Sequence, residues 1–281
     1  MNTIPLVRPS PIAGTWYSAD PDKLSESIKG YLDQVPSRTY PQDIPGIVVP
    51  HAGHRYSGQT AAYGFAAVNG REFDVVAVLS PLHDYQPHPF LTSSFAFYQT
   101  PLGKVEVAHR DLGWLQNELN SELVYMRSDR EHSIEIQLPF LQTVLKPGFM
   151  LLPLMIRTRV WDEVKQLSEK LATLAGCKKM LFVASTDLSH FYSKTVAAGY
   201  DEEVLTRLRA MDAKSLLKVE EDQVGFACGI SAVATVLEVI KLLGADRVEV
   251  LHRSDSSSET GDTSSVVGYA SAIIYRSEAA A

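Results

Sequence analysis

The sequence predicts a single α/β domain in which helices flank a central mixed, mostly parallel sheet. Three short apolar runs, rich in valine and bounded by proline or polar residues, are typical of buried strands; they span residues 46–50, 74–82 and 180–189. Helical and strand-like patterns alternate along the rest of the chain, as they do in layered α/β proteins. The 281 residues contain no internal repeat and no long low-complexity linker, so we expect one domain over residues 1–281.

Local signals predict the other regular elements. Asp20 precedes Pro21, which gives the first helix an N-cap and a proline at its first position. A small-residue-rich segment follows the first buried run and fits a helix that packs closely on the sheet. Helices are predicted over residues 20–35, 57–68, 110–120, 160–175, 195–211 and 229–243, and further strands over residues 149–156, 247–253 and 266–275.

Three further segments are assigned on weaker patterns. Residues 133–145 carry a mostly helical apolar stripe and are predicted as one helix, with Ser133 as its N-cap. Segments 90–98 and 105–108 are expected to form an antiparallel extension. The stretch 253–265 is rich in Ser, Thr, Asp and Gly and is predicted to be a loop over the site.

Composition excludes several classes of function. The net charge is −7 and no run is rich in lysine or arginine, so we expect no nucleic-acid partner. No apolar run approaches the roughly 20 residues that cross a bilayer, and residues 1–17 do not resemble a signal peptide. The two cysteines, Cys177 and Cys228, are too few for a disulfide framework, so a cytoplasmic protein is expected.

Each of the three buried runs ends in a histidine: His51, His83 and His190. Ligands of open α/β sheets bind just beyond the carboxyl ends of the strands, so these imidazoles are expected at one edge. Together they would form a metal site or an acid/base site, and imidazole suits Fe, Cu, Zn or Ni. The alternative for any single one is a structural histidine held by hydrogen bonds.

Cys228, Asp187 and His132 are further candidates, each with two interpretations. Cys228 precedes an apolar helix, whose N-terminus would lower the pKa of the thiol and favour the thiolate ligand; otherwise it is a small buried hydrophobe. Asp187 either orients an imidazole or caps the turn after its strand. His132 either donates a proton or hydrogen bond to substrate, or simply begins a helix.

Five short segments, taken together and in this order, resemble the MEMO family, whose microbial members are called AmmeMemoRadiSam system protein B. They are Ala-Gly-Thr-Trp-Tyr (13–17), Pro-His-Ala-Gly (50–53), Glu-His-Ser-Ile-Glu (131–135), Asp-Leu-Ser-His (187–190) and Ala-Cys-Gly (227–229). The resemblance covers essentially the whole chain. It implies a fold like that of class III extradiol dioxygenases, in which two histidines and a carboxylate hold Fe(II) and another histidine acts as acid or base.

Carried onto this chain, the resemblance implies His51 and His83 as metal ligands, with Cys228 in place of the carboxylate. It implies His190 as the acid/base histidine, with Asp187 and His132 in the same pocket. The chain departs from the family pattern after His83, where Asp84 replaces a second histidine, and at His54, where many members have an aromatic residue.

These observations leave three functions open. The first is a MEMO-like metalloprotein that performs non-haem Fe(II) redox chemistry, or copper chemistry, on an unknown small molecule. The second is a zinc-dependent hydrolase, because Cys and two His also hold catalytic zinc. The third is a non-catalytic protein that binds a metal or a peptide and acts through partners. The family name also implies an association with AMMECR1-like and radical SAM proteins.

Overall fold

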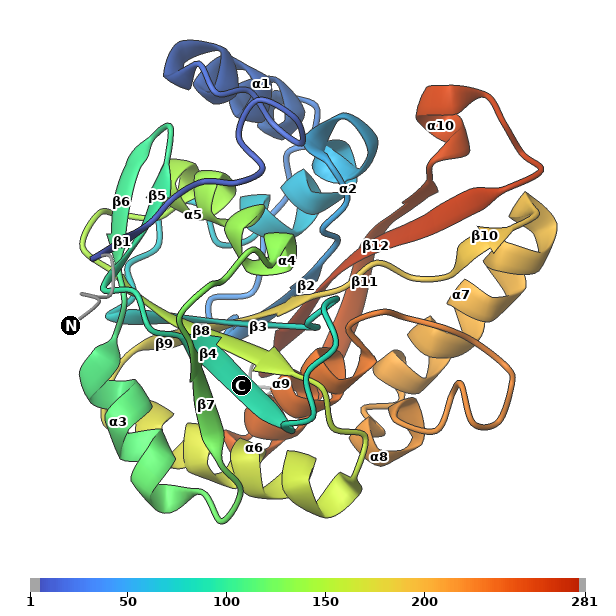
Figure 1. Ribbon diagram of the computed structural model, residues 1–281. Helices are drawn as coiled ribbons and strands as arrows, with labels where there is room; N and C mark the ends of the chain where they lie inside the picture. The colour runs from blue at the N-terminus through green and yellow to red at the C-terminus, as the bar shows by residue number, and fades with distance from the viewer. Residues whose placement is uncertain (1–5, 278–281) are drawn as a thin grey trace.

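The computed structural model describes residues 6–277, which form one α/β domain around a mixed sheet (Figure 1). Four neighbouring central strands run parallel, in the order β2–β9–β3–β8. They are β2 (Gly46–Val49), β9 (Met180–Ser185), β3 (Val75–Ser80) and β8 (Met150–Ile156). Almost every residue of these strands is buried, which explains their continuous apolar sequences. The predicted α/β class and the three buried strands are confirmed.

Antiparallel strands complete the sheet on both sides of this parallel core. On the β2 side, β12 (Val266–Tyr275) pairs with β2, with β11 (Arg247–Asp255) and with the short β10 (His190–Tyr192). On the other side, β4 (Phe90–Ser93) pairs with β8 and then, in parallel, with β7 (Leu123–Met126). The site lies on the side of the sheet where the central parallel strands end.

The expected antiparallel extension is only partly correct. β4 joins the main sheet, whereas β5 (Phe97–Thr100) and β6 (Gly103–Glu106) form a hairpin in a separate sheet with β1 (Val7–Arg8). The hairpin therefore pairs with a strand from the start of the chain. This partner lies about ninety residues away in sequence, and local patterns could not predict the pairing.

Helices cover both faces of the sheet (Figure 1). α1 (Pro21–Asp33), α2 (His54–Ala66) and α5 (Leu138–Val144) pack together on one face, and α6 (Trp161–Ala175) and α9 (Ile230–Leu242) lie on the other. α3 (His109–Glu118) contacts α6; α7 (Lys194–Arg209) and α8 (Ala213–Leu216) pack beside β11 and α9. No helix among residues 6–277 combines the length and the apolar character needed to cross a membrane.

Two local predictions about the helices are confirmed. Asp20 caps α1, because its carboxylate accepts hydrogen bonds from the backbone N–H groups of Asp22 and Lys23. The small residues of α2 allow close packing: a Cβ added at Gly64 would lie only 2.6 Å from a methyl carbon of Val49. α2 therefore lies close enough to β2 to fix the loop between them, which carries His51.

The single helix predicted over residues 133–145 is wrong. The chain forms α4 (His132–Glu135), a turn, and then α5. Pro139 explains the break: it has no N–H to donate to the carbonyl of Glu135, and its ring would clash with that carbonyl in a continuous helix. Ser133 is not the N-cap either; Glu131 is, and its side chain accepts the Ser133 N–H.

The segment predicted as a loop over residues 253–265 is more ordered than expected. β11 continues to Asp255, and α10 (Ser257–Thr260) follows before an irregular connection to β12. Figure 1 shows α10 at the far end of the long β11–β12 hairpin, near the start of α2. Ser256 and Thr260 from this segment line the same cavity as the candidate site residues.

Candidate metal centre

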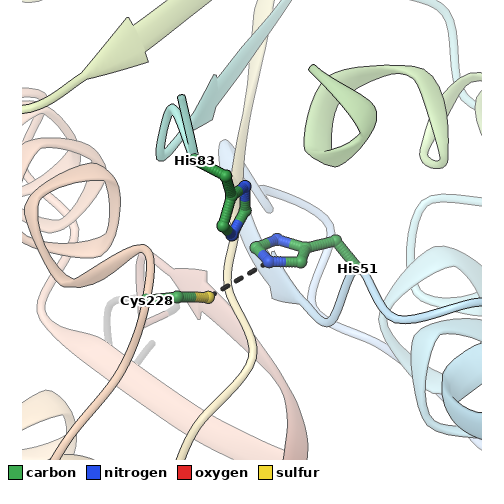
Figure 2. Close-up of side chains that lie close together, drawn as sticks. All are labelled: His51, His83 and Cys228. Atoms are coloured by element: carbon green, nitrogen blue, oxygen red, sulfur yellow. Dashed lines mark hydrogen bonds between the residues drawn. The ribbon is translucent and has the colours of Figure 1, made fainter. Parts of the chain in front are cut away.

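The ends of β2 and β3, which both pair with β9, bring His51 and His83 together as predicted. Their ring centroids lie 5.4 Å apart, edge to face. Cys228, just before α9, joins them: its Sγ lies 3.1 Å from Nε2 of His51. Figure 2 shows the two imidazoles and the thiol pointing toward one another. One donor atom from each residue lies within 4.8 Å of the other two, a spacing that a single divalent metal ion can bridge.

His51 is held on both its ring and its backbone. The ring is almost fully buried, and Nδ1 contacts the Ser185 hydroxyl at 3.0 Å, which leaves Nε2 directed toward Cys228. The backbone N–H groups of His51 and Ala52 donate to Oδ1 of Asp187, at 2.7 and 3.2 Å. Burial lowers the pKa of His51, and the neighbouring imidazoles lower it further. The neutral ring that results is the form that binds metal.

Asp187 orients His51 through the backbone rather than through the imidazole itself. It caps the turn that carries His51, rather than the turn after its own strand, and its second oxygen lies 4.0 Å from Nε2 of His51. Burial raises the pKa of Asp187 to about 7, although the backbone hydrogen bonds from His51 and Ala52 oppose this. The carboxyl group lines the cavity.

The expected effect of the α9 N-terminus on Cys228 is outweighed by burial. Burial raises the pKa of the Cys228 thiol well above its usual value, and the nearby Asp187 raises it further. The N–H of Asp187 points at Sγ from 3.2 Å, which favours the thiolate but does not compensate. A bound cation would supply the missing positive charge, because a coordinated thiol loses its proton. Cys177, in contrast, is exposed and far from the site in sequence.

His190 does not follow a strand but begins one, because β9 ends at Ser185 and β10 starts at His190. It lines the same cavity, of about 540 Å³, but among the described residues it belongs to no cluster of donor atoms within 4.8 Å. Burial lowers the pKa of His190. Its ring packs edge to face against Phe226, with centroids 5.3 Å apart. The structure thus separates His190 from the His51–His83–Cys228 cluster.

His132 also lines the cavity, where its ring stacks on His83 with centroids 4.5 Å apart. Burial lowers the pKa of His132 to about 4, although the charge of Glu131 opposes this. The rings of Trp16 and His132 also lie close together, tilted by 42°, with their centroids 4.2 Å apart. His132 is therefore a neutral, half-buried group in the cavity wall and not merely the start of a helix.

Sequence reasoning missed Glu131, which contacts both His83 and His132. Burial by itself would raise the pKa of this carboxyl, but the hydrogen bond from His83 and the two imidazoles hold it well below its usual range. Its place beside His132 in the Glu-His-Ser-Ile-Glu segment was the only sequence signal for it.

A buried arginine, Arg8 on β1, supports the segment that carries Glu131. Its side chain is fully buried and pairs with Asp129 at 2.8 Å and with Glu135 at 2.5 Å. Its third nitrogen donates to the backbone carbonyl of Glu131 at 2.6 Å. Tyr17 also donates to Glu135. No local sequence pattern identifies Arg8 as buried, because such a charge is stable only with partners that lie far away along the chain.

His54, where the chain departs from the family pattern, does not contribute to the metal cluster. It begins α2, packs against Phe140, and donates from Nε2 to the Ile136 carbonyl at 3.2 Å. Asp84, the other departure, is exposed beside His83.

We expect His54 to make the protein sensitive to acid. Burial lowers the pKa of His54 to about 4 from 6.5, so the unfolded chain binds this proton more readily than the folded protein. The contribution of the neutral His54 ring to the free energy of unfolding is therefore complete above pH 6.5. It is lost as the pH falls toward 4, by about 3 kcal/mol in total. The melting temperature of His54→Gln should therefore fall less between pH 6.5 and pH 4 than that of the wild type. An equal fall in both proteins would contradict this assignment.

Comparison with known proteins identifies the family to which the chain belongs. The family model described as Memo-like protein matches residues 8–273. Curated relatives called MEMO1 family protein include one from Thermotoga maritima, 34% identical over 278 residues that span 94% of this chain and 98% of the relative. Another, from Nitrosopumilus maritimus, is 30% identical over 274 residues, with the same two coverages. The chain therefore belongs to the family of Memo-like proteins.

Proposed function

We propose that this protein binds a redox-active transition metal, Fe(II) in the first place, through His51, His83 and Cys228, and oxidises or reduces a small molecule in the adjoining cavity. The observation that carries the proposal is the convergence of two imidazoles and one thiol within 4.8 Å at the wall of that cavity. The donor set fits such an ion, because imidazole and thiolate both suit Fe and Cu. When bound, the metal would supply the electron-transfer step and an open position for a ligand.

The protein's own groups have separate tasks in this proposal. Ser185 and Asp187 hold His51 through its ring and its backbone, so that its free nitrogen keeps one direction. Trp16, Tyr56 and Tyr269 form an aromatic part of the cavity wall that would bind an apolar part of the substrate. His190, in the same cavity, would accept or donate a proton at a ring nitrogen.

Elemental analysis of protein purified without oxygen tests the metal assignment, with Cys228→Ser measured alongside. We expect near-stoichiometric iron or copper in the wild type and a large loss in the variant. Cys177→Ser is the matched control, because that thiol is exposed and distant from the cluster in sequence, and it should keep its metal. Zinc in the wild type would favour a hydrolase, since Cys and two His also form catalytic zinc sites. The absence of any metal would contradict the proposal.

The assignment of His190 as a proton-transfer group rather than a ligand gives a second test. His190→Ala should keep the wild-type metal content, because the three donors stay in place, and should lose any turnover that the wild type shows in the same assay. His88→Ala is a control, because His88 pairs with Glu122 near the surface. Loss of metal from His190→Ala would make His190 a fourth ligand. Full turnover in the variant would remove it from the chemistry.

The small-molecule substrate stays a prediction, as does a pathway shared with AMMECR1-like and radical SAM proteins. Genes for both kinds of protein beside the gene for this chain would support the shared pathway, and their absence would weaken it.

A further inference from the structure

We infer that Glu131 orients two imidazoles of the site at once, fixing both His83 and His132 with the hydrogen on Nδ1 and the free lone pair on Nε2. The part that concerns His83 as a metal ligand rests on the function proposed above. The part that concerns His132 rests on the 3.2 Å distance from its Nδ1 to the carboxylate and on the charge of that group.

Both rings place Nδ1 close to the same buried carboxylate, although only the contact from His83 has the geometry of a hydrogen bond. Nδ1 of His83 lies 3.0 and 3.1 Å from the two oxygens of Glu131, and Nδ1 of His132 lies 3.2 Å from Oε1. A carboxylate accepts hydrogen bonds and repels the lone pair of a ring nitrogen, so it favours N–H at both Nδ1 positions. The two rings stack in front of it at an interplanar angle of 26°.

The carboxylate has little freedom to move away from the rings. Oε2 accepts the backbone N–H of His83 at 2.7 Å, and Oε1 accepts that of Ser133 at 2.9 Å. The backbone of Glu131 is held as well: its carbonyl accepts from Arg8, and its N–H donates to Asp129 at 3.0 Å. The whole group is about 5% exposed. Three N–H groups, from the ring and backbone of His83 and the backbone of Ser133, therefore hydrogen-bond to two fixed oxygens that solvent barely reaches, and Nδ1 of His132 lies close beside them.

This arrangement has a different consequence for each ring. For His83 it leaves Nε2 as the nitrogen that can bind metal, as in other sites where a carboxylate supports a histidine ligand. For His132 it leaves Nε2 as a hydrogen-bond acceptor in the cavity wall. A substrate bound against His132 would therefore present a hydroxyl or an amine, and not an unprotonated oxygen, to this nitrogen.

The tautomers can be read directly from long-range ¹H–¹⁵N correlation spectra of the full chain after treatment with a chelator. His83→Gln and His132→Gln serve only to assign the two sets of signals. We expect both rings of the wild type in the Nδ1–H form, which is the less common one in water. Either ring in the Nε2–H form would overturn the inference for that ring. Because this measurement needs no Glu131 variant and no metal, its result is independent of the proposed metal chemistry.

Glu131→Gln then tests what the carboxylate does for metal binding. An amide replaces one of the two acceptor oxygens by a donor, so it cannot accept from all three N–H groups that hydrogen-bond to the carboxylate. With Zn(II) as a diamagnetic probe, we expect about 10- to 100-fold weaker affinity than in the wild type, together with a change of tautomer in at least one ring. Glu122→Gln, at the exposed Glu122–His88 pair, is the matched control and should bind Zn(II) normally.

The outcomes separate the two proposals. Unchanged Zn(II) affinity and unchanged tautomers in a folded Glu131→Gln protein would overturn the role of Glu131, whereas the metal site would stand. A wild type that binds no Zn(II), iron or copper would overturn the proposed function, whereas the tautomers would still decide the role of Glu131 at His132. If Glu131→Gln does not fold, the wild-type spectra alone decide the inference.

Discussion

Replacing either His51 or His83 by alanine is expected to remove most of the bound metal. Each substitution deletes one of only three donors of the cluster. Glu131 and His132 lie beside His83, and Asp187 lies beside His51, but among the described residues none of them forms a second cluster with Cys228. Changes to groups that merely support a ligand already cost about 10- to 100-fold in affinity, so loss of a ligand should exceed roughly 100-fold. Metal content by elemental analysis and competition with a chromogenic chelator measure the effect.

The stability of the variants and a matched control separate loss of a ligand from loss of the fold. His83 is exposed at the edge of the sheet, so metal-free His83→Ala should melt close to the metal-free wild type, whereas His51 is almost fully buried and its replacement should also lower the melting temperature. His109→Ala is a suitable control, because this histidine lies on α3 and bonds to the Phe95 carbonyl. Stoichiometric metal in both His51→Ala and His83→Ala would reject the ligand assignment.

Replacing Arg8 by methionine is expected to destabilise the fold by about 3–5 kcal/mol. The guanidinium is fully buried between Asp129 and Glu135, and its removal would leave two buried carboxylates without their partner. Methionine keeps most of the side-chain volume, so the loss reflects charge and hydrogen bonds rather than a cavity. Urea unfolding at neutral pH measures the change.

A surface pair provides the comparison for Arg8. Arg38 pairs with Glu249, but both side chains are more than one third exposed, so Arg38→Met should cost no more than about 1 kcal/mol. Adding Glu135→Gln to Arg8→Met should recover part of the lost stability, because it removes one unpaired charge. A cost for Arg8→Met as small as that for Arg38→Met would show that the buried network contributes little.

Much of the fold could be read from the sequence because its signals are local. The buried strands are apolar on both faces, so their runs stand out without knowledge of their neighbours. Asp20 and Pro21 marked the start of α1 in the same way. Two predictions failed for different reasons. Pro139 is a local signal that breaks the single helix predicted over residues 133–145. The pairing of the β5–β6 hairpin with β1, in contrast, is set by a strand about ninety residues away.

Part of the candidate site could also be predicted. His51 and His83 follow neighbouring runs, and parallel strands necessarily bring their carboxyl ends to one edge of a sheet. His190 was placed correctly in the cavity but wrongly on a strand end, because the chain turns after Ser185 and reaches the cavity from β10.

The sequence by itself thus determined the α/β class, the buried strands and the edge at which the histidines meet, since each follows from short-range patterns. Only the tertiary structure decided which polar groups contact one another: Cys228 reaches His51 across 177 positions, Glu131 reaches His83 across 48, and Arg8 reaches Asp129 across 121. Hydrogen bonds and ion pairs act over a few ångströms and produce no periodic pattern in the sequence. Which groups form them is therefore determined by the packing of segments that are far apart along the chain.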